Sequence, residues 1–184
     1  MVVILTEEPS MQLFLETLIS RYYPNLLFKV IPHRGKQDLE KHIPKILKSW
    51  HVPNSHFLIV HDQDSWDCRT LKNNLQSICN AIRPGVVVRI ACVELEAWYW
   101  GDLLAVEQAF GRHDLQSLSG KSKYRIPDSI VNPKDELRKH LPHYEQLDGA
   151  KRIAEYAMID RNTSNSFQVF IKSLQGIAHS LTSA

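Results

Sequence analysis

Short apolar runs alternate along the chain with segments in which apolar residues recur at helical spacing. Residues 2–5 form an apolar, largely β-branched run, and Met11, Leu15, Leu18 and Ile19 follow it on one face of an expected helix. The pattern repeats, with strands expected at 2–5, 27–31, 56–60 and 86–92 and later helices at 38–50, 68–82 and 95–110. Strands separated by helices predict an α/β fold, a mostly parallel four-stranded sheet flanked by helices.

The pattern changes after Phe110. Residues 111–133 are mostly polar, and helical spacing returns near 133–140, 149–158 and 165–180 without another strand signal. We therefore expect an α/β domain at 1–110 and a polar loop with a helical appendage at 111–184, packed together as one globular unit.

Composition narrows the class of protein. The chain has 184 residues, of which 43% are hydrophobic and 23% charged, as in one ordinary globular domain. No apolar run approaches the ~20 residues that cross a bilayer, and the three cysteines form no CxxC pair. We expect a cytoplasmic protein without membrane, disulfide or zinc-ribbon elements. The net charge of +2 permits a phosphate-bearing partner without requiring one.

Acidic residues follow three of the expected strands. In open parallel sheets, ligands bind outside the carboxyl ends of the strands. If the first and third strands are neighbours, their acids meet, and clustered carboxylates without a basic partner favour a hard cation such as Mg²⁺ or Mn²⁺. A single acid can instead cap a helix or be solvated; the D-x-D spacing is the stronger signal. The acids are Glu7 and Glu8, Asp62 and Asp64, and Glu94 and Glu96.

These acids lie in segments that resemble a known module. TEEPS at 6–10 and HDQDS at 61–65 resemble the two acidic motifs of the Toprim domain, a metal-binding α/β module of topoisomerases, primases and overcoming-lysogenization-defect nucleases. VELEAWYWGD at 93–102 is similar to a bacterial Toprim-like family known as domain of unknown function 4276. The similarity continues through HRGKQDL at 33–39, DCRTLKNNL at 67–75 and RNTSNSFQVFIKSL at 161–174.

The resemblance implies a divalent-metal-dependent phosphoesterase, a nuclease acting on DNA in preference to RNA. It assigns Glu7, Asp62 and Asp64 as catalytic residues and metal ligands, with Glu94 and Glu96 as further ligands of Mg²⁺ or Mn²⁺. It also implies a partner ATPase and a role in phage or mobile-element defence.

Two positions depart from the Toprim pattern. Glu8 stands where the first motif has glycine, and Met11 stands where it has a second acid. Glu8 then either supplies a ligand or alters substrate access. An alternative function is a catalytically silent subunit that binds nucleic acid or a protein and works with an ATPase.

Basic and aromatic residues supply further candidates. Six basic residues could bind substrate phosphate. A solvated loop is favoured for four of them, Arg34, Lys36, Lys121 and Lys123, and pairing with nearby acids explains Lys151 and Arg161 equally well. The aromatic residues Trp98, Tyr99 and Trp100 could stack on bases, but core packing is favoured for them. The sequence contains no Walker A, GxSxG or Rossmann motif, so it does not match the simplest kinds of ATPase, serine hydrolase or dinucleotide-dependent enzyme. The basic candidates are Arg34, Lys36, Lys121, Lys123, Lys151 and Arg161.

Overall fold

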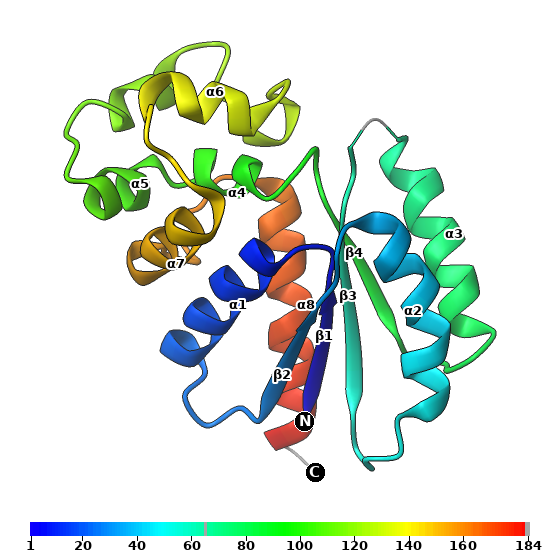
Figure 1. Cartoon of the computed structure of the whole chain (residues 1–184). Coiled ribbons are helices and arrows are strands. Elements are labelled where there is room, and N and C mark those ends of the chain that lie inside the picture. Colours follow the sequence, from blue (N-terminus) through cyan, green and yellow to red (C-terminus); the bar gives the residue numbers. More distant parts are fainter. Residues whose placement is uncertain (65, 183–184) are drawn as a thin grey trace.

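A parallel sheet of four strands lies at the centre of the computed structural model, which describes residues 1–64 and 66–182 (Figure 1). The strands are β1 (Val2–Thr6), β2 (Phe28–Pro32), β3 (His56–Asp62) and β4 (Val87–Ala91), in the order β2-β1-β3-β4. The α/β fold expected from the strand–helix alternation is confirmed. The first and third strands are neighbours, with Thr6 opposite Val60 at the carboxyl end.

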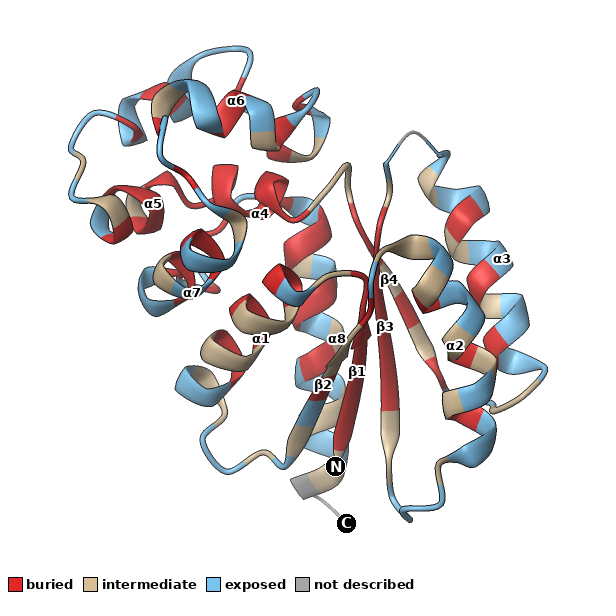
Figure 2. Ribbon diagram, viewed as in Figure 1, coloured by how far each residue is buried: buried red, intermediate tan, exposed pale blue. Residues whose placement is uncertain are grey.

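Helices cover both faces of the sheet. Helices α1 (Pro9–Tyr22) and α8 (Asn165–Thr182) lie on one face, and α2 (Lys36–Ser49) and α3 (Cys68–Asn80) lie on the other (Figure 1). Successive strand residues point to opposite faces. Ile4 therefore packs in the core beneath α1, whereas Val3 packs in a second core beneath α2 and α3. Figure 2 shows the buried residues concentrated in the strands and on the helix faces that meet them.

The remaining helices gather beyond the carboxyl ends of the strands, beside α1 (Figure 1). They are α4 (Glu96–Trp100), α5 (Leu103–Phe110), α6 (Pro133–His140) and α7 (Gln146–Tyr156), and the polar loop holds short 3₁₀ turns at Gln116–Gly120 and Pro127–Ser129. Helix α7 packs against α1 and α5, and α8 against β4. The carboxyl edge of the sheet thus has a helical wall on one side.

Several expected element boundaries differ from the structure, and three of the differences affect the carboxyl edge of the sheet. The helix expected at 95–110 is divided because Asp102 leaves the helical conformation at φ −141° and its side chain caps α5 at Ala105, and because the Gly101 carbonyl accepts from the Thr163 N–H at 2.9 Å instead of from the next helical turn. Helix α2 begins at Lys36 and continues through Pro44. Strand β3 extends to Asp62, so this acid is a strand residue and not part of the exit loop.

The aromatic segment of α4 belongs to the core, as the sequence favoured. Trp98, Tyr99 and Trp100 are each at most 2% exposed. The Trp98 ring lies 5.3 Å from that of Phe167 on α8, and Trp100 stacks on Tyr124 at 4.4 Å. No helix in the described part of the chain is both long and apolar enough to cross a membrane.

Candidate active site

Two carboxylates meet where β1 and β3 end. Glu7 follows β1 directly and Asp62 is the last residue of β3, so the parallel register brings them side by side. The Asp62 backbone N–H donates to Glu7 Oε2 at 3.3 Å. His61 Nδ1 lies 3.4 Å from the same oxygen and 2.6 Å from the Asp62 carbonyl. The structure therefore places the Glu7 and Asp62 carboxylates together, in a buried position backed by an imidazole.

Asp64 is turned to the same edge by its backbone. It adopts the left-handed conformation at φ 53°, and its N–H donates to the Val93 carbonyl at 2.9 Å. Val93 is itself left-handed at φ 62°, which is a strained position for a β-branched residue. The loops that follow β3 and β4 are thus locked together and bring Asp64 close to Glu94.

The inner carboxylates are electrostatically costly. Burial, followed by the charges of Glu7 and Glu96, raises the pKa of Asp62 well above its ordinary value. Burial likewise raises the pKa of Glu7, although His61 opposes the rise. Asp62 Oδ1 is buried and has no hydrogen-bond partner among the described residues. An unsatisfied buried carboxylate oxygen of this kind is what a bound cation would stabilise.

Glu96 lies at the start of α4 and is 2% exposed. Tyr144 donates its hydroxyl to Glu96 Oε1 at 2.9 Å. Burial, and then the charge of Glu94, raises the pKa of Glu96 to about 7. We call Glu7, Asp62, Asp64, Glu94 and Glu96 the acidic edge.

Two lysines partner the outer members of the acidic edge, contrary to the expectation of acids without a basic partner. Lys36 Nζ lies 2.9 Å from Asp64 Oδ2, and Lys134 Nζ lies 3.4 Å from Glu94 Oε2. The Lys134 backbone N–H also donates to Glu94 Oε1 at 2.7 Å. All four residues line a cavity of about 560 Å³. The cavity therefore offers both carboxylate oxygens and ammonium groups.

The donor chemistry of the acidic edge fits a hard divalent cation. Its ligands are carboxylate oxygens, which Mg²⁺ and Mn²⁺ prefer, and one of them is unsatisfied. Among residues 1–64 and 66–182, no three His, Cys, Asp or Glu side chains are already arranged to hold an ion. At least one carboxylate would have to rotate before three of them could bind the same ion.

The two departures from the Toprim pattern have different positions. Met11 is 3% exposed and packs in the core beneath α1, away from solvent. Glu8 is half-buried before α1, and its Oε2 accepts hydrogen bonds from Ser10 at 3.2 Å and Gln146 at 3.4 Å.

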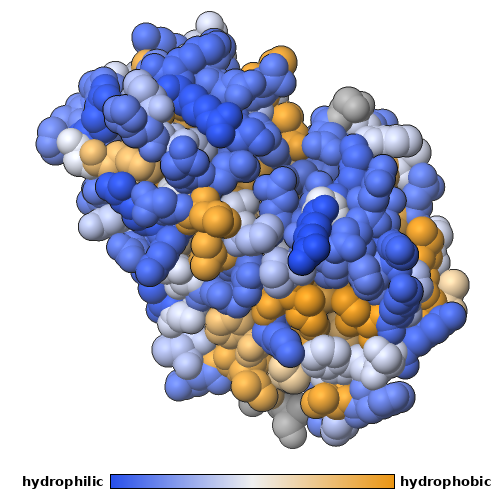
Figure 3. Space-filling view, viewed as in Figure 1, coloured by the Kyte–Doolittle hydropathy of each residue, from blue (hydrophilic) through white to orange (hydrophobic). Residues whose placement is uncertain are grey.

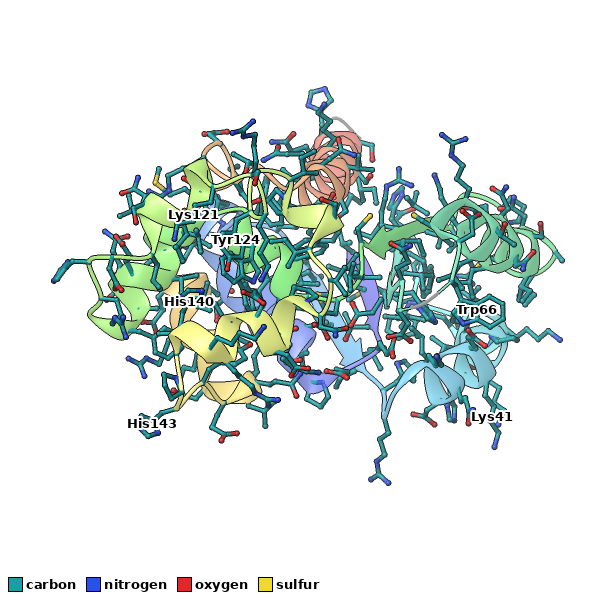
Figure 4. All side chains as sticks on the ribbon, turned by 90° about the horizontal axis from the view of Figure 1, so that it is seen from above. Lys41, Trp66, Lys121, Tyr124, His140 and His143 are labelled. Atoms are coloured by element: carbon teal, nitrogen blue, oxygen red, sulfur yellow. The ribbon has the colours of Figure 1, made fainter. Side chains whose placement is uncertain are left out.

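The other basic candidates have varied surroundings. Arg161 pairs with the buried Asp102 through hydrogen bonds of 2.6 and 3.0 Å, and Lys123 Nζ lies 2.6 Å from Glu136. Each of these two residues is engaged with a structural acid. The remaining three side chains are exposed: Arg34 follows β2, Lys121 lies in the polar loop and Lys151 on α7. In the view onto the carboxyl ends, Lys121 lies over the helical wall (Figure 4).

Sequence reasoning missed Lys134 and Tyr144. Both come from the region after the polar loop, and their contacts with Glu94 and Glu96 span about forty residues or more. The helix-start signal at Pro133 placed Lys134 in a first turn, but nothing in the spacing indicated that this turn covers the acidic edge. Trp66 was also passed over, although an aromatic residue beside a D-x-D segment was a visible signal.

Comparisons with known proteins identify a family and a similar fold. A family model described as "Domain of unknown function (DUF4276)" matches residues 6–175. Two solved structures of the C-terminal region of the Xanthomonas campestris pv. campestris OLD protein are similar, both at 15% identity and over 98% of this chain. One has a TM-score of 0.55 over 95% of its own chain, the other 0.53 over 97%. This likeness shows the fold alone. No curated protein matches.

Proposed function

The chain belongs to the DUF4276 family, and we propose that it is a divalent-metal-dependent phosphoesterase, a nuclease that hydrolyses nucleic-acid phosphodiesters. The observation that carries the proposal is the pair of buried carboxylates of Glu7 and Asp62, whose pKa values are raised and one of whose oxygens has no partner among the described residues. Structural acids are ordinarily paired or hydrogen-bonded, because burial of an unpaired charge is costly. Perturbed acids at the carboxyl edge of a parallel sheet therefore favour a functional site.

The acidic residues of the site would bind the cation, and the basic residues would bind the phosphate. Glu7, Asp62 and Asp64 would hold Mg²⁺ or Mn²⁺, with Glu94 and Glu96 in support. The bound cation supplies activation of water and stabilisation of the leaving oxygen. Lys36 and Lys134, held beside Asp64 and Glu94, bind and orient the phosphodiester when it enters the cavity. His61 orients Glu7, since its ring contacts both that carboxylate and the Asp62 carbonyl.

Further features of the proposal rest on the resemblance to Toprim nucleases. DNA is the favoured substrate, the setting is phage or mobile-element defence, and an ATPase is the expected partner. Nuclease assays are therefore to be repeated with the product of any neighbouring ATPase gene.

Plasmid nicking tests the function. Purified protein is incubated with supercoiled plasmid or with RNA in Mg²⁺, Mn²⁺ or EDTA. We expect cleavage that depends on the cation and falls to background when Asp62→Asn and Asp64→Asn are combined. Asp148→Asn is the matched control, because Asp148 is an exposed aspartate on α7 that pairs only with Arg152 among the described residues. Cleavage that survives in the double variant would refute the assignment.

A catalytically silent binding subunit is the second candidate. It is favoured by Met11, which occupies the second acid's place and lies in the core, so that this position cannot contribute a ligand. Calorimetric titration with Mn²⁺ tests the metal site, which the nuclease requires. Nucleic-acid binding without cleavage, with and without the ATPase, would support the silent subunit.

A further inference from the structure

Trp66 is a large aromatic residue left in solvent beside the acidic edge. Its exposed fraction is 56%, whereas Trp98 and Trp100 are buried and Trp50 is half-buried. Gln63 fixes its backbone: the Trp66 N–H donates to the Gln63 carbonyl at 3.2 Å, and Gln63 Nε2 donates to the Trp66 carbonyl at 2.9 Å. The backbone that carries the exposed indole is thus anchored to Gln63, the residue before Asp64.

The indole borders a groove between α2 and α3. This α2–α3 groove has a volume of about 300 Å³. In the view onto the carboxyl ends, Trp66 lies over the space between these two helices (Figure 4). On the face shown in Figure 3, the larger hydrophobic areas lie in the lower half of the molecule, nearer the amino ends of the strands. Trp66, Leu71, Leu75 and Ile78 supply the apolar lining of the groove, and Lys36, Gln37, Glu40 and Asn74 supply its polar lining.

The chemistry of the α2–α3 groove is that of a site for a flat heterocycle. Trp66 supplies an aromatic face, and Leu75 and Ile78 supply aliphatic walls. Asn74 adds an amide that can hydrogen-bond to a polar ring edge. Protein sites that bind bases combine an aromatic platform with a few polar groups in this way.

Lys36 connects the groove with the acidic edge. It lines both the α2–α3 groove and the cavity of Asp64 and Glu94, and its Nζ lies 2.9 Å from Asp64 Oδ2. A ligand that fills both places and binds the Lys36 ammonium carries an anionic group, such as a phosphate, beside a planar, largely apolar group. A nucleotide within a nucleic-acid strand has this composition.

We propose that the α2–α3 groove is the subsite for one unpaired nucleobase, stacked on Trp66 next to the phosphate bound at Lys36. This inference rests on the proposed nuclease function and names its substrate class: nucleic acid that presents an unpaired base, as a single strand does. A base within a duplex is already stacked on both faces and paired at its edge, so it cannot enter the groove without being extruded.

The experiment measures binding separately from cleavage. Fluorescence anisotropy records the affinity for a labelled oligothymidine, for an abasic strand of the same length and for a blunt duplex, with Ca²⁺ in place of Mg²⁺. The variants are Trp66→Ala, Trp66→Phe, which keeps an aromatic face, and Tyr156→Ala, which removes another exposed aromatic residue from α7. Plasmid and oligothymidine cleavage with Mg²⁺ and Mn²⁺ is followed in parallel.

We expect Trp66→Ala to weaken oligothymidine binding by about 5- to 150-fold, since one base–aromatic stack contributes ~1–3 kcal/mol. Trp66→Phe should keep most of the affinity, Tyr156→Ala all of it, and the abasic strand and duplex should not distinguish Trp66→Ala from wild type. Unchanged oligothymidine binding in Trp66→Ala, with cleavage intact, overturns the subsite alone. Equal losses on the abasic strand overturn base stacking as the cause. A wild-type protein that neither binds nor cleaves any nucleic acid overturns both the subsite and the proposed function.

Discussion

Replacing Glu96 by glutamine is expected to stabilise the protein at neutral and higher pH. The Glu96 carboxyl is 2% exposed, and within residues 1–64 and 66–182 its one hydrogen bond from a side chain is the 2.9 Å bond from Tyr144. Burial and the charge of Glu94 raise its pKa from 4.5 to about 7. Glutamine keeps the shape and an acceptor oxygen for Tyr144 but never acquires the charge that burial opposes.

The sign and size of the effect follow from the two pKa values. Between pH 4.5 and about 7 the folded protein keeps the Glu96 proton while the unfolded chain has released it, so stability falls as pH rises through this window. The full difference corresponds to about 3 kcal/mol of unfolding free energy. Glu96→Gln should therefore match wild type near pH 4 and exceed its stability by up to about 3 kcal/mol near pH 8.

Urea unfolding at a series of pH values, with EDTA present so that no cation compensates the charge, measures this difference. Glu136→Gln is a matched control with the opposite sign, because Lys123 and Lys139 hydrogen-bond to Glu136 and lower its pKa to about 2. That stabilisation is present above pH 4.5 and lost as pH falls towards 2, so this variant should be weakened at neutral pH only. A Glu96→Gln difference that does not change with pH would refute the reasoning.

Three further predictions concern the surrounding structure. Mn²⁺ at a hundredfold excess over its Kd should stabilise the wild-type protein by about 2.7 kcal/mol, measured as a higher Tm. If the Tm still rises with Mn²⁺ in the variant that combines Asp62→Asn with Asp64→Asn, the ion binds elsewhere. Arg161→Ala should cost about 3–5 kcal/mol in urea unfolding, because it leaves Asp102, which is 3% exposed, without its cation; an unchanged midpoint would contradict a structural role. Val93→Gly should raise the unfolding free energy by roughly 1 kcal/mol, because glycine relieves the strain of the left-handed backbone at φ 62°. A lower unfolding free energy in the same assay would show that the valine side chain contributes more than the strain costs.

The sheet was predicted well because each of its strands is specified by a short pattern of neighbouring residues. Each strand is a short apolar run, and a parallel sheet buried on both faces requires such runs between helices. Glu7 and Asp62 could be paired in advance because only the adjacency of β1 and β3 had to be assumed. The division of the 95–110 helix was not predictable in this way, since the Gly101 carbonyl accepts its hydrogen bond from Thr163, a distant residue of the chain, and not from the next helical turn.

The motifs of the resemblance serve two different purposes, which sequence alone does not separate. RNTSNSFQVFIKSL contains Arg161, which pairs with Asp102, and Asn162, whose Nδ2 donates to the Trp98 carbonyl at 2.8 Å. Ser166 Oγ accepts the indole N–H of Trp98 at 2.9 Å. This segment therefore fastens α4 to α8, so that its likeness to the family reflects packing as well as chemistry.

The fastening of α4 has a consequence for the acidic edge. Glu96 is the first residue of α4, and Glu94 lies two residues before it. Both acids are therefore positioned by a helix that the segment 161–174 holds in place through hydrogen bonds. The same helical wall brings Lys134 onto Glu94 and Tyr144 onto Glu96. Asp64 instead meets Lys36 of α2, on the other side of the sheet. The acidic edge is thus assembled from two structural halves, and a substrate that draws Lys36 and Lys134 away from their carboxylates would free oxygens on both halves at once.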